Sequence, residues 1–205
     1  MKLRGLYGMI DLTPAADADA AERLARALLD GGAAIVQLRM KRALASDQLA
    51  AVERLRPLCH ARGVRFIVND RLDVALAGGA DGVHLGQDDL PLAAARRVAP
   101  GGFVIGISTH DEAQARAAVD GGADYIGFGP CFATSTKENP DPVVGLEALA
   151  RVCRLPLPVV AIGGITLDRV ATVARAGAAA AAVIRAVNGA ADVAAAARVV
   201  AAAFA

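Results

Sequence analysis

Residues 65–86, RFIVNDRLDVALAGGADGVHLG, contain one complete unit of the repeating pattern that decides the fold. Two short apolar runs, 65–70 and 82–86, have the length and composition typical of buried strands. The residues between them have helical apolar spacing and end in Gly78-Gly79-Ala80. Glycine adopts the left-handed conformation that ends many helices at no steric cost, so this phrase predicts a helix-to-strand connection.

The same phrase returns along the chain at matching places. It occurs as Gly-Gly-Ala at 31–33, 78–80 and 121–123, and as Ala-Gly-Ala at 176–178. Chance glycines in a chain rich in Ala and Gly would not keep a fixed place in the pattern. The predicted strands are residues 5–11, 34–40, 65–70, 82–86, 103–108, 125–129, 159–163 and 180–184. The helices between and after them include 20–29, 46–61, 111–119, 168–176 and 192–204, with Ser46 and Asp111 as N-caps.

Strict alternation of buried strands and helices indicates a parallel sheet. Eight units favour closure into a barrel over the alternative, an open doubly wound sheet. The chain has 205 residues, which is near the lower limit for such a barrel and requires short loops. No linker interrupts the pattern. We therefore predict an α/β fold, a (β/α)8 TIM barrel, as a single domain over residues 1–205.

Composition excludes several classes of partner. The net charge is +1, from 22 basic and 21 acidic residues, so no bulk field attracts nucleic acid or a membrane surface. Aromatic residues make up only 3%, too few for a base-stacking surface. The N-terminus does not resemble a signal peptide, and charged residues interrupt the Ala-rich C-terminal stretch. Three cysteines without a C-x-x-C motif predict a reducing, cytoplasmic location.

In barrels of this kind the active site lies at the carboxyl ends of the strands. The second predicted strand ends in Gln37, Arg39 and Lys41, which strand alternation places on one face. Two cations and an amide suit a diphosphate group, because Arg binds as a fork and Lys as a point charge. The alternative, a merely solvated strand end, would place two like charges at the barrel mouth without an anion. We therefore favour a diphosphate site.

Carboxylates follow the third and fourth strands. Asp70 ends one strand, and Asp88 and Asp89 come shortly after the other. Mg²⁺ typically takes one or two carboxylates together with phosphate oxygens and waters, so the pattern predicts a magnesium site. Asp70 is the stronger candidate, whereas Asp88 and Asp89 are equivalent by this reasoning and either suits a helix cap. His84 lies within a strand, where a lone histidine is more often a satisfied core residue than a catalyst.

Further donors follow the later strands. Ser108 either contacts a ligand or caps the helix that opens at Asp111. The longest loop, 129–142, carries Thr134, Thr136 and Lys137, which suit a phosphate but also an ordinary polar surface. Gly164 lies where such barrels often bind phosphate through backbone N–H groups. Two anion sites in one mouth suit a transfer reaction with diphosphate as leaving group.

The ordered set of these motifs resembles the thiamine phosphate synthase family, over nearly the whole chain. The motifs are Gln-Leu-Arg-x-Lys at 37–41, Asn-Asp at 69–70, His-x-Gly-Gln-x-Asp at 84–89, Gly-x-Ser at 106–108, Thr-x-Thr-Lys at 134–137 and Gly-Gly-Ile at 163–165. The opening Leu6-Tyr7 with Asp11 is also similar to that family's first strand. Each motif alone is weak, but their order is specific.

The resemblance implies a transferase that joins an aminopyrimidine methyl diphosphate to a thiazole phosphate. It implies the following residues by their place in the motifs. The pyrimidine diphosphate would contact Gln37, Arg39, Lys41, Asn69, Ser108 and Lys137; the thiazole phosphate would contact Thr134, Thr136, Gly164 and the backbone at Ile184 and Arg185; Mg²⁺ would bind Asp70 and Asp89; and the catalytic set would be Arg39, Lys41, Ser108 and Lys137.

The implied mechanism is dissociative: diphosphate leaves first, the aminopyrimidine stabilises a methyl cation, and the thiazole nitrogen then attacks. One position departs from the family, which usually has Ser where this chain has Arg185. A backbone N–H contact survives that change, while the guanidinium either replaces the hydroxyl with a stronger fork or intrudes on the pocket.

Two alternative functions follow from the same residues. A thiazole tautomerase of the same superfamily would act on one phosphorylated ligand and would not need the diphosphate cluster. A non-catalytic paralogue that binds the thiazole phosphate as a regulator is favoured only by Arg185. Small-molecule substrates are the expected partners, with a homo-oligomer left open.

Overall fold

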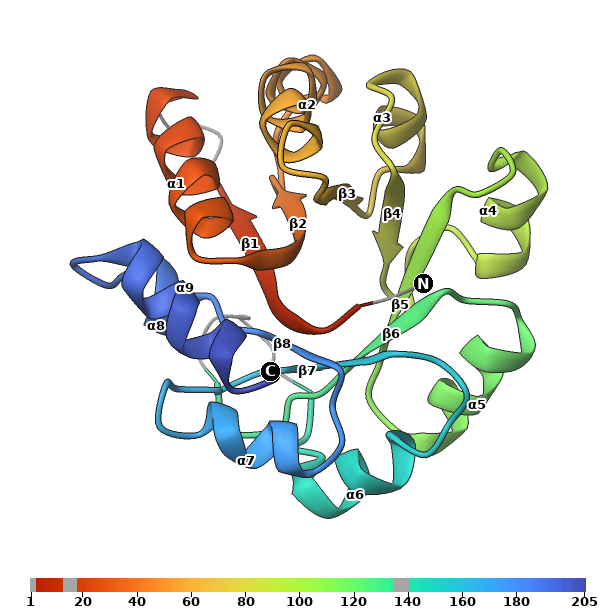
Figure 1. Ribbon diagram of the computed structural model, residues 1–205. Coiled ribbons are helices and arrows are strands. Elements are labelled where there is room, and N and C mark those ends of the chain that lie inside the picture. The colour runs from red at the N-terminus through yellow and green to blue at the C-terminus, as the bar shows by residue number, and fades with distance from the viewer. Residues whose placement is uncertain (1–2, 13–17, 135–140) are drawn as a thin grey trace.

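A computed structural model describes residues 3–12, 18–134 and 141–205 of the chain, and it confirms the predicted barrel. Eight parallel strands pair in sequence order, and β8 pairs with β1 to close the ring. Figure 1 shows the strands at the centre and the helices around them. The strands are β1 (Gly5–Asp11), β2 (Ala33–Arg39), β3 (Arg65–Asn69), β4 (Gly82–Leu85), β5 (Val104–Thr109), β6 (Tyr125–Phe128), β7 (Val159–Ile162) and β8 (Ala180–Ala182).

The helices lie outside the ring and run from each strand to the next. Within the described residues they are α1 (Ala18–Asp30), α2 (Ala45–His60), α3 (Leu72–Ala77), α4 (Leu92–Val98), α5 (Glu112–Asp120), α6 (Gly145–Val152), α7 (Val170–Arg175), α8 (Arg185–Asn188) and α9 (Val193–Ala202). The short helix α8 was missed in the sequence, because four residues are too few for apolar periodicity to show. None of the described helices has the length and apolar character that a membrane crossing requires.

The apolar side chains form two cores, one on each face of the sheet. The larger core lies between strands and helices and includes Val36 and Leu38 of β2. The smaller core fills the barrel interior and includes Tyr7, Ile35 and Tyr125. Because side chains alternate along a strand, the inward face of β2 continues from Ile35 to Gln37 and Arg39. The strand thus leads directly from the packed interior to the polar rim at its carboxyl end.

The repeated glycine phrase has the conformation that the sequence predicted. The φ angles of Gly32, Gly79, Gly122 and Gly177 are 82°, 66°, 79° and 100°, all in the left-handed region. A side chain at these positions would strain the backbone. Each glycine therefore ends its helix and turns the chain into the following strand.

The structure confirms one predicted N-cap and contradicts the other. The Asp111 carboxylate accepts the backbone N–H of Gln114 at 2.8 Å, at the start of α5. Ser46, in contrast, lies inside α2, which begins at Ala45 after Leu44 and has no side-chain cap. A serine close to the start of a helical pattern was mistaken for the residue just outside it. Asp192 caps α9 in the same way as Asp111, by accepting from Ala195 N at 2.8 Å.

Replacing Asp111 with Ala is expected to lower the free energy of unfolding by about 1 kcal/mol, because α5 loses the acceptor for a free backbone N–H group. Urea denaturation followed by circular dichroism measures the change. Ser46→Ala is the matched control, and its free energy of unfolding should stay close to that of the unchanged protein. Equal losses in both variants would contradict the capping assignment.

Candidate active site

The carboxyl ends of β1 and β2 carry a partly buried ion pair. Asp11 and Arg39 are partners in the strand register, and Arg39 Nη1 donates to Asp11 Oδ1 at 2.6 Å. Their side chains are only 21% and 25% exposed, so both are held within the rim. The pair fixes the direction of the Arg39 guanidinium at the rim. The sequence noted Asp11 only as part of a motif, since its partner depends on strand register.

Lys41 lies next along the rim, just beyond the end of β2. Its ammonium is 3.5 Å from Asp70 Oδ2, which follows β3. The Lys41 side chain is 55% exposed, so it extends into the space above the rim. The structure therefore brings Arg39, Lys41 and Asp70 together on one edge, as the sequence predicted from the ends of β2 and β3. Asn69, the last residue of β3, is half-buried beside them.

Asp70 and Asp89 form a close carboxylate pair. Burial, together with the nearby Asp89 carboxyl within hydrogen-bonding reach, raises the pKa of Asp70 to about 6, although Lys41 acts in the opposite direction. Asp89 is held in place because its Oδ2 accepts the Gly86 N–H at 2.6 Å. Asp88, in contrast, is exposed. Of the two aspartates that the residues alone left equivalent, Asp89 is thus the one beside Asp70.

This pair fits a hard divalent cation. Two carboxylates crowded together without a cation repel each other, and a bound dication removes that cost. Within residues 3–12, 18–134 and 141–205, no group of three or more His, Cys, Asp or Glu side chains gathers in a way that suits a metal. A site with two protein carboxylates matches Mg²⁺, which commonly takes its remaining ligands from water and substrate phosphate.

The backbone conformation of Asp70 supports this arrangement. Its φ angle is 62°, a left-handed value that is uncommon for a residue with a side chain but tolerated by Asp. Its N–H donates to the carbonyl of His84 at 2.8 Å, so the turn is anchored to β4. The backbone thus leaves β3 in a direction that presents the carboxylate toward Lys41 and Asp89.

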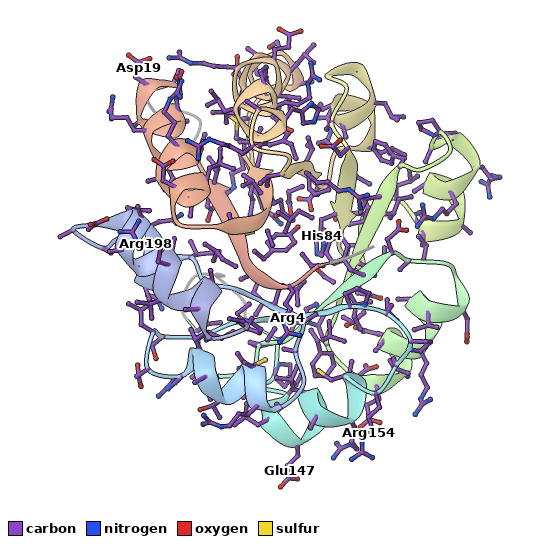
Figure 2. All side chains as sticks on the ribbon, in the orientation of Figure 1. Arg4, Asp19, His84, Glu147, Arg154 and Arg198 are labelled. Atoms are coloured by element: carbon purple, nitrogen blue, oxygen red, sulfur yellow. The ribbon has the colours of Figure 1, made fainter. Side chains whose placement is uncertain are left out.

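A chain of hydrogen bonds crosses the barrel interior below the rim. Gln37 Nε2 donates to the Tyr7 hydroxyl at 2.7 Å, and the Tyr7 and Tyr125 hydroxyls are 2.7 Å apart. The Tyr125 hydroxyl is 3.0 Å from His84 Nδ1, and His84 Nε2 is 2.9 Å from Ser108 Oγ. Figure 2 labels His84 inside the ring of strands. We call these five residues the interior chain.

The interior chain corrects the sequence interpretation in part. Both nitrogens of His84 have partners, in agreement with a satisfied histidine, but one partner is Ser108, a predicted substrate contact. Ser108 does not cap α5, because Asp111 does. Tyr125 was missed entirely. The available signal was that both tyrosines of an aromatic-poor chain stand inside predicted strands, where a buried hydroxyl needs a partner.

Burial lowers the pKa of His84 to about 4 from its ordinary 6.5, so the ring is neutral at physiological pH. The unfolded chain therefore takes up a proton at a higher pH than the folded chain, and stability falls as the pH decreases from about 6.5 to about 4. This group should contribute a slope of up to about 1.4 kcal/mol per pH unit. Unfolding free energies measured across this pH range, for the unchanged protein and for His84→Gln, test this contribution. If the two curves of unfolding free energy against pH ran parallel, His84 would not be its source.

The loops after β6 and β7 pack tightly together. Cys131 N and Phe132 N donate to the carbonyls of Ile162 and Gly163 at 2.8 and 3.0 Å. A Cβ atom on Gly164 would overlap the carbonyl oxygen of Ala133 and lie 2.7 Å from that of Phe132. The φ angle of Gly164 is 64°. Only glycine therefore allows this approach, which holds the segment leading to Thr134 against the end of β7.

The remaining predicted phosphate contacts are placed as follows. Ile184 precedes α8 and Arg185 is its first residue, with the Arg185 side chain exposed. Asn188 ties α8 to the first strand, because its Nδ2 donates to the carbonyl of Met9 at 2.9 Å. Thr136 and Lys137 lie outside the described residues.

Comparisons with known proteins identify the family to which this chain belongs. The family model described as thiamine monophosphate synthase matches residues 7–187. A thiamine-phosphate synthase from Anaeromyxobacter dehalogenans is 55% identical over 181 residues, which are 88% of this chain and 81% of the relative. One from Methanospirillum hungatei is 50% identical over 177 residues, 86% of each protein. A solved structure of thiamine phosphate pyrophosphorylase from Pyrococcus furiosus has a TM-score of 0.86 and 37% identity, and the match covers 99% of this chain and 96% of that one. With a closed barrel, a cationic and acidic rim and these relatives, the chain belongs to the thiamine monophosphate synthase family.

Proposed function

We propose that this protein joins an aminopyrimidine methyl diphosphate to a thiazole phosphate, with release of diphosphate and formation of thiamine phosphate. The observation that carries the proposal is the cluster of Arg39, Lys41, Asp70 and Asp89 on one rim of the barrel. Two cations beside two carboxylates suit a diphosphate together with its magnesium ion. The names of the family and of its relatives support the same reaction.

Arg39 and Lys41 would neutralise the charge that grows on the departing diphosphate. The bond between the methylene carbon and the diphosphate oxygen breaks first, and the electron-rich aminopyrimidine stabilises the cation left behind. The ring nitrogen of the thiazole then supplies the electron pair of the new carbon–nitrogen bond. That step transfers no proton, so it requires no general base.

Asp70 and Asp89 would hold Mg²⁺, which when bound supplies positive charge to the diphosphate oxygens. Gln37 and Ser108 would contact the pyrimidine substrate. Thr134, Gly164 and the backbone at Ile184 and Arg185 would hold the thiazole phosphate, while Thr136 and Lys137 stay sequence-based predictions. The Arg39–Asp11 pair would orient the guanidinium before the substrate arrives.

The direct test is incubation with both substrates, with and without Mg²⁺, followed by detection of thiamine phosphate and diphosphate. We expect both products only when both substrates and the metal are present. Binding of the thiazole phosphate without turnover would instead support a regulatory paralogue. Conversion of the thiazole phosphate alone would support a tautomerase.

Asp89→Asn is expected to raise the Mg²⁺ concentration for half-maximal rate by about 10-fold to 100-fold, because one of two carboxylate ligands is lost. Asp88→Asn is the matched control, since Asp88 is adjacent in sequence but exposed. Its magnesium dependence should equal that of the unchanged protein. Magnesium titrations of the initial rate measure both, and a shift in Asp88→Asn alone would reverse the assignment.

We further propose a cytoplasmic location. All three cysteines are free, and Cys59 and Cys131 are buried, which suits a reducing compartment. Association into a homo-oligomer stays a prediction, which sedimentation analysis tests.

A further inference from the structure

The interior chain has a direction that the donor and acceptor capacities of its members determine. Each tyrosine hydroxyl has a single hydrogen. The amide nitrogen of Gln37 is a donor, so the Tyr7 oxygen accepts from it and the Tyr7 hydrogen points to Tyr125. The Tyr125 hydrogen is then directed to His84 Nδ1, which lies 3.0 Å from the Tyr125 oxygen.

The same reasoning determines the state of the histidine. Nδ1 accepts a hydrogen bond and therefore carries no proton. The one proton of the neutral ring is then on Nε2, which donates to Ser108 Oγ at 2.9 Å. Because Ser108 accepts within the chain, its own hydroxyl hydrogen is not used there.

We propose that the interior chain holds His84 as the Nε2–H tautomer and thereby directs the Ser108 hydroxyl hydrogen out of the chain, where it donates to the diphosphate of the substrate. Tyr7, Tyr125 and His84 are positioning residues in this arrangement. The identity of the anion rests on the function proposed above, whereas the tautomer does not. In the reverse direction Ser108 would donate to His84 and turn a lone pair toward the anion.

Three members of the interior chain, Gln37, Tyr7 and Tyr125, are shielded from solvent. Gln37 and Tyr7 are each 2% exposed and Tyr125 is fully buried, so water does not replace their partners. Gly106 leaves the space for the Tyr125 ring, because a Cβ atom at this position would overlap it. Gly127 similarly borders His84, with its ideal Cβ position 3.5 Å from Nε2. The barrel interior is thus shaped around these rings.

Nitrogen-15 NMR of the imidazole rings tests the tautomer without any substrate. The protein has three histidines, and the variants His60→Gln and His110→Gln identify the His84 signals by elimination. We expect His84 Nε2 at the position of a protonated nitrogen and Nδ1 at that of an unprotonated one. The opposite pattern in the unchanged protein would overturn the proposal and needs no variant to be seen.

Gln37→Glu tests whether the direction is transmitted across the interior. An ionised carboxylate only accepts hydrogen bonds, so Tyr7 must donate to it. Tyr125 must then donate to Tyr7, and His84 must donate from Nδ1 to Tyr125. The His84 proton should therefore move from Nε2 to Nδ1, with the carboxyl carbon resonance checking ionisation. Gln114→Glu is the matched control, because the Gln114 oxygen already accepts from His110 N. An unchanged His84 tautomer in ionised Gln37→Glu would contradict the proposal.

The role of Ser108 is tested by binding of inorganic diphosphate with Mg²⁺, measured by calorimetry. Ser108→Ala should weaken binding by about tenfold to 100-fold, the loss expected for one hydrogen bond to a charged group. His84→Phe should weaken binding in the unchanged background but not further in Ser108→Ala, because the two act through one contact. Equal losses from His84→Phe in both backgrounds would reject the positioning role. Absence of any diphosphate binding by the unchanged protein would count against the proposed function and the Ser108 contact together. The His84 tautomer would still be decided by the nitrogen-15 spectrum.

Discussion

Asp70→Asn is expected to lower the turnover to thiamine phosphate by about 100-fold to 1000-fold while the barrel stays folded, the range seen when one group that stabilises developing charge is lost. Asn removes the charge but keeps the volume, and it also tolerates the left-handed backbone found at this position, where φ is 62°. An alanine would mix the loss of charge with backbone strain. Initial rates at saturating substrates measure turnover, and circular dichroism checks the fold.

Asp73→Asn is the control for this variant. Asp73 lies on α3, three residues away, and is bound by the Arg71 guanidinium at the protein surface. The hydrogen bonds from Arg71 hold the pKa of Asp73 below its ordinary value, so Asp73 is a charged carboxylate. Its replacement should leave the rate unchanged. Normal diphosphate release by Asp70→Asn would contradict the assignment of this rim.

Gly164→Ala is expected to destabilise the protein by about 2–4 kcal/mol, because it combines left-handed strain with steric overlap. The added methyl group would meet the carbonyl oxygens of Ala133 and Phe132, which are backbone atoms and cannot rotate away. The loop after β6 must then move off β7. We therefore also expect weaker binding of the thiazole phosphate, which calorimetry measures alongside urea denaturation.

Gly63→Ala separates the two causes. Gly63 has a φ angle of 65°, close to the 64° of Gly164, but nothing lies within 4 Å of the added Cβ position. This control carries the backbone strain alone and should cost about 1 kcal/mol. If Gly164→Ala cost no more than Gly63→Ala, the tight packing between the two loops would be wrong.

The sequence was informative wherever structure depends on local spacing. Glycine after a helix, as at Gly79 and Gly122, needs only its own φ angle to end that helix, so the pattern located the helix-to-strand connections. Alternation along β2 likewise placed Gln37 and Arg39 on the inward face. The exceptions are also local. Ser46 failed as an N-cap because helix boundaries vary by one or two residues.

The candidate site was predicted as a set of residue types but not as a set of partners. Strand order brought Lys41 to Asp70, as expected from neighbouring strand ends. The residues alone left Asp88 and Asp89 equivalent, and the resemblance implied Asp89. Only the turn after β4 shows which carboxylate faces Asp70, because a shift of one residue changes the direction of the side chain.

Taken by itself, the amino-acid order determined the alternation of strands and helices, the closure of eight units and the chemical character of the rim, since each follows from periodicities of two and 3.6 residues. The tertiary structure alone decided that Tyr7, Tyr125 and His84 are linked. These residues come from strands that meet across the barrel, and their hydrogen bonds depend on strand tilt, register and the space left by glycine. Such distances are properties of the closed ring, and no stretch of the chain carries them.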